Sequence, residues 1–143
     1  MTETVARPMS TLQLVGIYTG LYVGLAVLAL LVTMFLEFEN SAMGLIIAFA
    51  AASGMTQIWV SRERAAPASG RAWQVAVLCA AATTAIMSSV ATLALQAEDM
   101  VLQDLANEGA LMIGGVILGI FALNLCIIRL ALWVTGRSAA KRL

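Results

Sequence analysis

Few residues of this chain could do chemistry within its long apolar stretches, and Arg129 is the only one there that carries a formal charge. It lies six residues before Thr135, about 9 Å from the end of its stretch at a rise of about 1.5 Å per helical residue. A guanidinium at that depth can reach the headgroups of a membrane, and Trp133, one turn later, could stack on it. We interpret Arg129 as a snorkelling residue, with the binding of an anionic lipid headgroup as the alternative.

Asn124 is the second polar feature of the same stretch. An amide in hydrocarbon needs a hydrogen-bond partner, so we predict that Asn124 bonds across helices, with a ligand or ion role as the alternative. On a helix, Asn124 points about 180° away from Gly115 and about 140° away from Gly119. The two glycines and the amide should therefore face different neighbours.

Two tyrosines and two cysteines complete this set. Tyr18 and Tyr22 share roughly one helical face, opposite Gly20, which favours packing against lipid or another subunit; lining a site is the alternative. Cys79 and Cys126 are interpreted as packing residues, because a thiol buried in lipid is poorly ionised. They could be neighbours if their two helices are adjacent.

The missing residue types argue against catalysis. The chain has no histidine, and its apolar stretches contain no Asp or Glu. The usual proton relays, histidine metal sites and histidine-activated nucleophiles are therefore unavailable, and no phosphate-binding loop occurs. We predict no enzyme, and no catalytic, cofactor-binding or metal-binding residue. Four acids match no standard cation site and are interpreted as a solvated face: Glu98, Asp99, Asp104 and Glu108.

Four apolar stretches must position these residues: 12–36, 42–60, 72–95 and 109–135. Each is close to or longer than the roughly 20 residues that a helix needs to cross the hydrocarbon core. Their continuous apolarity differs from the alternation of a membrane β-barrel. With 62% hydrophobic and 11% charged residues, the chain is predicted to be an all-α, polytopic membrane protein. Its four transmembrane helices would form one antiparallel bundle, a single domain over residues 1–143.

The charges are divided between the two sides of these stretches. All eight basic residues lie in the N-terminal tail, in loop 61–71, or in the last stretch and its tail. The short turn 37–41 and the loop 96–108 contain no Lys or Arg and carry six of the eight acids. Basic segments resist translocation, so this bias predicts cytoplasmic termini, a cytoplasmic loop 61–71 and an external acidic loop 96–108. The external loop could form a short interfacial helix or extend the preceding span.

The three tryptophans, Trp59, Trp73 and Trp133, all lie at the predicted cytoplasmic boundary. Indole prefers the headgroup level because it combines an apolar body with one hydrogen-bond donor. We therefore predict that all three are interface anchors.

Small residues recur every four positions in each stretch. Gly16, Gly20 and Gly24 form the longest glycine row, and Gly115 with Gly119 forms a second. Such rows let another helix backbone approach closely. We interpret them as packing within one bundle; alternatively, the three-glycine row faces another protein or a second copy. The remaining stretches have rows that include alanine: Gly44, Ala48 and Ala52, and Ala81, Ala85 and Ser89.

Several loop and tail residues carry a family resemblance: Asn40, Arg62, Arg64, Ala66-Pro67, and Ile128-Arg129-Leu130 followed by a basic tail. With these, the chain resembles a small, functionally unassigned family of four-span bacterial inner-membrane proteins. It departs from the family pattern at Gly70 and Arg71, where an acid would follow the proline. The resemblance implies a multi-pass protein of the bacterial cytoplasmic membrane and brings no activity with it.

Two functions from different classes remain. The first is a non-catalytic accessory, assembly or structural subunit that packs with itself or a larger membrane complex through its small-residue rows. The second is a small homo-oligomeric channel or transporter, with Asn124, the hydroxyls of 72–95 and the two tyrosines along its path. The expected partners are the lipid bilayer and a second copy or a membrane complex. Nucleic acid is not expected, because membrane orientation alone accounts for the cations.

Overall fold

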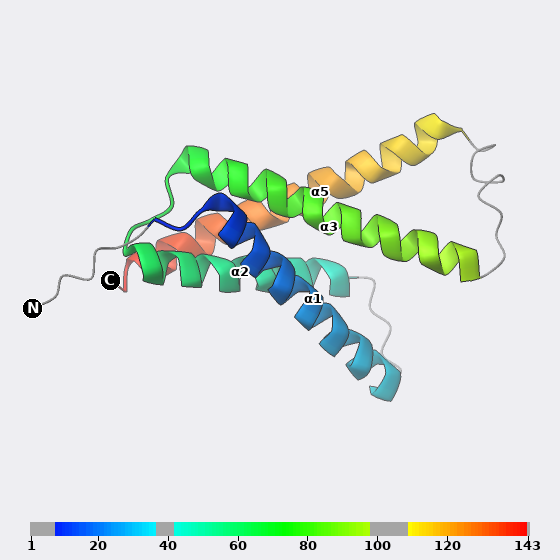
Figure 1. Cartoon of the computed structure of the whole chain (residues 1–143), viewed down its shortest axis with the longest axis horizontal. Coiled ribbons are helices and arrows are strands. Elements are labelled where there is room, and N and C mark those ends of the chain that lie inside the picture. Colours follow the sequence, from blue (N-terminus) through cyan, green and yellow to red (C-terminus); the bar gives the residue numbers. More distant parts are fainter. Residues whose placement is uncertain (1–7, 37–41, 98–108, 143) are drawn as a thin grey trace, which may run out of the picture.

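Four long helices make up the fold in residues 8–36, 42–97 and 109–142, the part of the chain that this computed structural model describes. They are α1 (Thr11–Leu36), α2 (Met43–Glu63), α3 (Ser69–Ala97) and α5 (Ala110–Ala140) (Figure 1). All four are long and apolar enough to cross a membrane. The predicted all-helical architecture with four membrane-spanning segments is confirmed at this level of length and composition.

Three of the helices extend beyond the apolar stretches that predict them. α2 continues to Glu63 instead of ending at 60, α3 begins at Ser69 instead of 72, and α5 continues to Ala140 instead of ending at 135. Apolarity marks only the part of a helix that hydrocarbon can cover. Backbone hydrogen bonding continues into the polar residues that follow, because most of them tolerate a helix.

Two residues with positive φ lie at helix boundaries. Arg64 ends α2 in the left-handed region, with φ 48° and ψ 32°, and its N–H donates to the carbonyl of Val60 at 2.8 Å. Gly109 precedes α5 with φ 98°. Glycine adopts that conformation readily because it has no Cβ, whereas Arg64 occupies its position at a steric cost.

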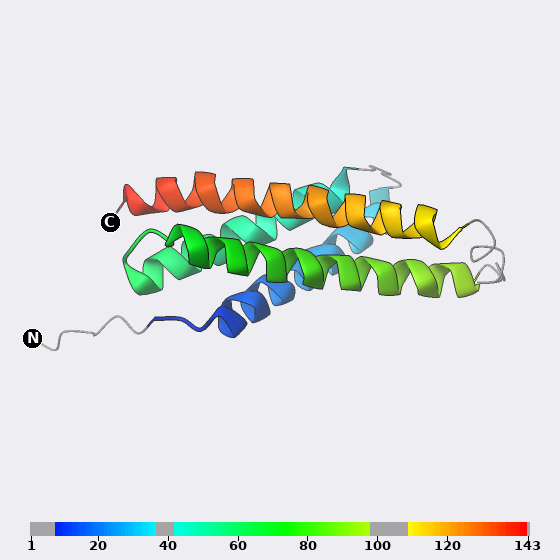
Figure 2. The same ribbon diagram turned by 90° about the horizontal axis from the view of Figure 1, so that it is seen from above.

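The helices form a ring in which α1 packs against α2 and α3, and α5 packs against the same two helices. The start of α1, the α2–α3 connection and the end of α5 lie together (Figures 1 and 2). We call this the basic end, because these described cations gather there: Arg62, Arg64, Arg71, Arg137, Lys141 and Arg142. At the opposite end, α1 and α5 diverge (Figure 1).

The core lies in the half of the molecule nearest the basic end. The buried residues of α1, from Leu14 to Tyr22, belong to its first half. Those of α5, from Asn124 to Gly136, extend from its middle towards its C-terminal end. In the apolar 18-residue segment of each helix, 39% of the residues are buried in α2, but only 6% in α1 and 11% in α5. Apolar side chains of the diverging half are exposed, such as Phe35 at 85% and Leu111 at 92%. Lipid or another protein must cover them.

Some sequence predictions fall outside the described residues. These are the tight turn 37–41 and most of the external acidic loop 96–108. Of that loop, only Gln96 and Ala97 at the end of α3 are described. The choice between an interfacial helix and an extended span stays a prediction. The sidedness of the bundle also stays a prediction.

Candidate functional site

The three-glycine row of α1 lies on the outer surface of the bundle. Gly16, Gly20 and Gly24 are exposed, and a Cβ added to any of them would meet no atom within 4 Å. The buried residues Tyr18 and Tyr22 lie on the opposite side of the same helix. The interpretation that this row packs within one bundle is therefore wrong, because the tyrosine side of α1 faces the core and the glycine side faces outwards.

The other small-residue rows divide between inside and outside. Gly115 and Gly119 of α5 are exposed with open space around them, like the row of α1. Ala81 and Ala85 of α3 are also exposed. In α2, by contrast, two of the three residues of the row are inward: Ala48 and Ala52 are fully buried. Gly44 is half-buried, and a Cβ added to it would meet no atom within 4 Å. Of these rows, only the alanines of α2 therefore pack within the bundle.

The closest glycine contact between helices involves a residue outside the predicted rows. A Cβ on Gly54 of α2 would lie 3.1 Å from Cδ1 of Leu21 on α1. A Cβ on Gly136 of α5 would lie 3.5 Å from Cδ of Pro67. No four-residue glycine spacing marks either position, so the sequence offers no signal for them.

The tyrosines of α1 belong to the core. Tyr18 is fully buried, and its hydroxyl forms a hydrogen bond of 2.7 Å with Oγ1 of Thr83 on α3. Tyr22 is 4% exposed, and its ring stacks against that of Tyr18 with centroids 6.1 Å apart. The prediction of lipid or intersubunit packing is wrong for both, because each faces inward. Tyr18 and Thr83 instead join α1 to α3 within the apolar interior.

Asn124 points inward on α5 and is 5% exposed. The predicted hydrogen bond across helices is not formed with any residue that the structure describes. The side chain is not completely enclosed, so its amide can still contact molecules outside the bundle. Gly115 and Gly119 lie on the outer side of the helix, so the expected separation of the amide from the glycines is observed.

The thiols occupy different environments although their helices are adjacent. Cys79 is buried in the core on α3, and Cys126 is exposed on α5; both are free. Cys79 is thus a packing residue as predicted. Cys126 lies on the outer surface in a shallow apolar groove with Leu125 and Leu130.

Two arginines of α5 stack on exposed tryptophans. The guanidinium carbon of Arg129 lies 5.1 Å from the ring centroid of Trp73 on α3, and that of Arg137 lies 4.8 Å from Trp133. The predicted pairing of Arg129 with Trp133 is therefore wrong, because α3 is adjacent to α5 and supplies a different indole. Trp73 and Trp133 are 48% and 53% exposed, as a lipid-facing position requires.

Trp59 differs from the other two tryptophans. It is fully buried, so it does not meet lipid as an interface anchor, and the guanidinium of Arg71 lies 5.1 Å from its ring centroid. Arg71 also donates to both carboxylate oxygens of Glu63, at 2.9 and 3.1 Å, and to the carbonyl of Met9. The N–H of Met9 donates to the same carboxylate at 2.8 Å. This network joins the segment before α1 to the end of α2 and the start of α3.

In the sequence, Arg71 counts among the cations of loop 61–71 and departs from the family pattern, while Glu63 is not singled out. Their opposite charges near the two ends of the 61–71 segment are a weak signal for the pair, since many such pairs stay separated in water. Nothing in the sequence indicates that the backbone of Met9 completes the network. The partner comes from a segment 54 positions away.

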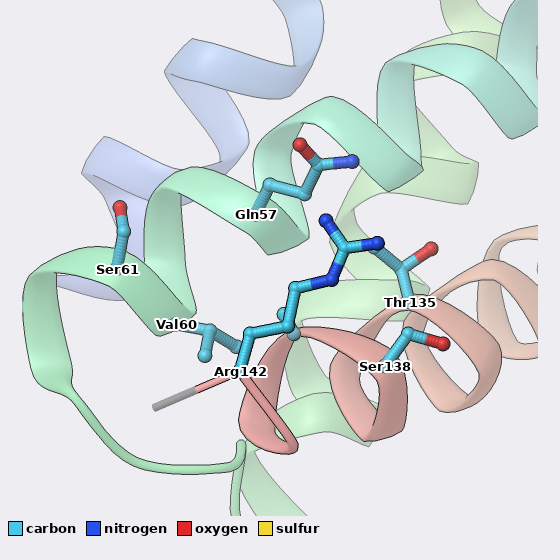
Figure 3. Close-up of a pocket in the computed structure, with 7 residues that line it drawn as sticks. Gln57, Val60, Ser61, Thr135, Ser138 and Arg142 are labelled. Atoms are coloured by element: carbon cyan, nitrogen blue, oxygen red, sulfur yellow. The ribbon is translucent and has the colours of Figure 1, made fainter.

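An open cavity of about 290 Å³, lined by both polar and apolar side chains, lies between the final turns of α2 and α5 (Figure 3). The Arg142 side chain extends towards Gln57 across it (Figure 3). Nearby, the hydroxyl of Thr135 donates to Oγ of Ser53 at 3.2 Å. The cavity can hold a small polar group by hydrogen bonding, but its lining contributes neither a carboxylate nor an imidazole to act as a base. It is lined by Gln57, Val60, Ser61, Thr135, Ser138, Ala139 and Arg142.

The chain matches no known family model, no curated protein and no solved structure. The resemblance to a four-span bacterial family therefore stays a prediction.

Proposed function

We propose that this protein is a non-catalytic integral membrane protein that packs, through its outward glycine rows, against a second copy or a larger membrane complex. It would act there as an accessory, assembly or structural subunit. The observation that carries the proposal is the row Gly16, Gly20 and Gly24. These glycines lie opposite the buried face of α1, and the space above them is open.

A groove along a membrane helix is filled either by lipid or by another helix, and the packing decides between them. Helices in lipid gain little from burying apolar surface, because lipid tails are equally apolar. Association instead depends on close van der Waals packing, which glycines permit by letting two backbones approach. α1 places its longest glycine row where no helix of its own bundle can use it. A neighbouring transmembrane helix would use it.

The charge distribution supports a specific orientation within this proposal. The helices would form an antiparallel bundle in a bacterial inner membrane, with both termini and the α2–α3 connection in the cytoplasm. Six described cations lie at the basic end, and a seventh, Arg129, lies near the end of its span. The single described acid, Glu63, is paired with Arg71. Lys and Arg count in this bias whether or not an acid lies nearby, so the described cations at the basic end favour a cytoplasmic position.

A channel or transporter is the second candidate, and Asn124 favours it. Its buried amide has no hydrogen-bond partner among the described residues, and a polar path through an oligomer would supply one. Against this, Tyr18 and Thr83 use their hydroxyls on each other inside the bundle. Such a path would therefore have to lie between subunits or require this pair to separate.

Photo-cross-linking from the glycine face of α1 in native membranes tests the proposal. A cross-linked protein of another kind, recovered at constant stoichiometry, would identify an accessory subunit and its complex. A discrete homo-oligomer would favour the channel and justify flux assays in liposomes. Cross-links to lipid alone would contradict packing through this row.

A further inference from the structure

The outer face shared by α3 and α5 combines a cationic cavity with an apolar groove. We infer that it binds one anionic phospholipid, with the phosphate held in the cavity and an acyl chain lying along the groove. This inference does not depend on the proposed packing of α1, because it concerns another face of the molecule.

The cavity lies near the basic end and has a volume of about 550 Å³. α5 contributes Arg129 and Arg137 to its lining, and Lys141 follows directly after the helix. The α2–α3 connection and the first turns of α3 contribute residues that include Pro67 and Ser69. No carboxylate lies in this lining. Three cations therefore face one open space without a neutralising partner in it, which favours an anion.

Stacking holds two of these cations in place while leaving their donors available. Arg129 lies over Trp73 and Arg137 over Trp133. Stacking uses the face of a guanidinium and leaves its N–H groups at the edge, where they can donate to phosphate oxygens. Within the described chain, neither side chain makes an ion pair or hydrogen bond. The amide N–H groups in the first turn of α3, beginning at Ser69, add a further preference for negative charge.

The apolar groove continues from the cavity. It has a volume of about 350 Å³ and shares Arg129 and Trp133 with the cavity, while Leu125 and Leu130 contribute apolar surface. From Leu125 to Lys141 the helix rises about 24 Å, at about 1.5 Å per residue. A leaflet is roughly 20 Å deep, half of a bilayer of about 40–45 Å. The combined surface thus matches a phospholipid better than a free anion, which would leave the groove unused.

The test uses tryptophan fluorescence of the purified full-length protein in vesicles of phosphatidylcholine. Either phosphatidylglycerol or phosphatidylcholine with brominated acyl chains is added, since bromine quenches nearby indoles. Trp73 and Trp133 are accessible to such chains, whereas Trp59 is buried and gives a constant background. Each cation near a membrane surface favours an anionic lipid by roughly fivefold. We expect phosphatidylglycerol to quench with an apparent affinity at least about fivefold higher than that of phosphatidylcholine.

The variants separate this site from general surface charge. Arg129→Gln with Arg137→Gln should lower the lipid preference at least about fivefold and leave only the contribution of Lys141. Arg62→Gln with Arg64→Gln removes the same charge from exposed positions outside the cavity and should leave the preference unchanged. Lys141→Gln, a milder change just beyond α5, should reduce it partially. Helix content measured by circular dichroism shows that each variant is folded.

Three outcomes would overturn the inference. The first is equal quenching by the two brominated lipids in the wild-type protein. The second is an equal loss of preference in the two paired variants, which would indicate general surface charge. The third is abolition of the preference by millimolar inorganic phosphate, which would indicate a free-anion site.

Discussion

Each tryptophan of this chain lies beneath an arginine, but the three pairs differ in their exposure and in what they contribute. Trp59 is inside the core, under Arg71, while Trp73 and Trp133 lie on the outer surface. Cation–π contacts of this kind contribute about 0.5–1 kcal/mol when exposed and more when desolvated. The buried pair therefore contributes most to stability, and the exposed pairs mainly orient guanidinium groups.

The hydroxyl pair of Tyr18 and Thr83 is the clearest polar contact inside the bundle. We expect Tyr18→Phe to lower the free energy of unfolding by about 0.5–1.5 kcal/mol, since interhelical hydrogen bonds in membranes average about 0.6 kcal/mol. The loss is limited because Thr83 can donate to a carbonyl of its own helix instead. Reversible unfolding in mixed detergent micelles measures this value.

A double-mutant cycle with Thr83→Val isolates the contact. The expected coupling energy is about 0.6–1.7 kcal/mol. Tyr22→Phe is the matched control, because Tyr22 is equally inward but its hydroxyl has no hydrogen bond among the described residues. A coupling energy near zero, or an equal loss in the control, would show that this hydrogen bond does not stabilise the bundle.

Sequence reasoning identified most of these residues but not their partners. The sequence predicts that Trp133 stacks on Arg129, whereas the indole under Arg129 belongs to Trp73 of α3. It grouped Tyr18 and Tyr22 on one face without showing that this face is the buried one. Side-chain partners depend on which helices are adjacent and how each is rotated. Neither property is encoded in the apolarity of a single span.

The predicted spans match the helices to within two residues at the diverging end of the bundle. At the basic end, the helices extend further than the predicted spans. The end of α2 shows why. Its last residue, Glu63, is held by Arg71, and Arg64 then closes the helix in the left-handed conformation. Glycine is the residue most often found in this conformation, so its absence conceals the helix end from sequence analysis.

Arg64→Gly should stabilise the protein by about 0.5–1 kcal/mol. A residue with a Cβ pays about 1–2 kcal/mol in the left-handed region, and the greater freedom of glycine when unfolded offsets part of that gain. Arg64→Ala is the matched control, since it removes the charge but keeps the Cβ. Unfolding in mixed micelles should rank the glycine variant above both others. Equal stability of the two variants would mean that the backbone at this position is not strained.

At the scale of the whole molecule, the bundle is packed at one end and diverges at the other (Figure 1). The sequence predicts four spans from their length, but each span looks equally apolar all round. It therefore gives no indication that α2 is the most buried helix and α1 among the least. The direction of the glycine rows is hidden for the same reason.

Cysteine labelling tests the proposed orientation of the molecule. Ala110→Cys and Ser138→Cys place exposed thiols at the diverging end and the basic end. They are made in a background where Cys79 and Cys126 are alanine. In spheroplasts, a membrane-impermeant maleimide should label the first position readily and the second only after permeabilisation, because basic segments stay in the cytoplasm. The reverse pattern would place the basic end outside.

In the proposed function, the glycine face of α1 meets protein and not only lipid. The most direct measurement places a small photo-reactive diazirine amino acid at Val27, two turns after Gly20 on the same face, and irradiates native membranes. The matched control places it at Ala50, which is exposed on α2. Mass spectrometry then identifies the adducts. We expect a defined protein adduct from Val27 and only lipid adducts from Ala50.

The row itself is tested by adding Gly20→Leu to the Val27 probe, which fills the groove and should abolish the protein adduct. Ala50→Leu adds the same bulk elsewhere and should leave the adduct unchanged. Lipid adducts alone at Val27 in the otherwise unchanged protein, or a protein adduct that survives Gly20→Leu, would show that α1 does not pack against protein through its glycine row.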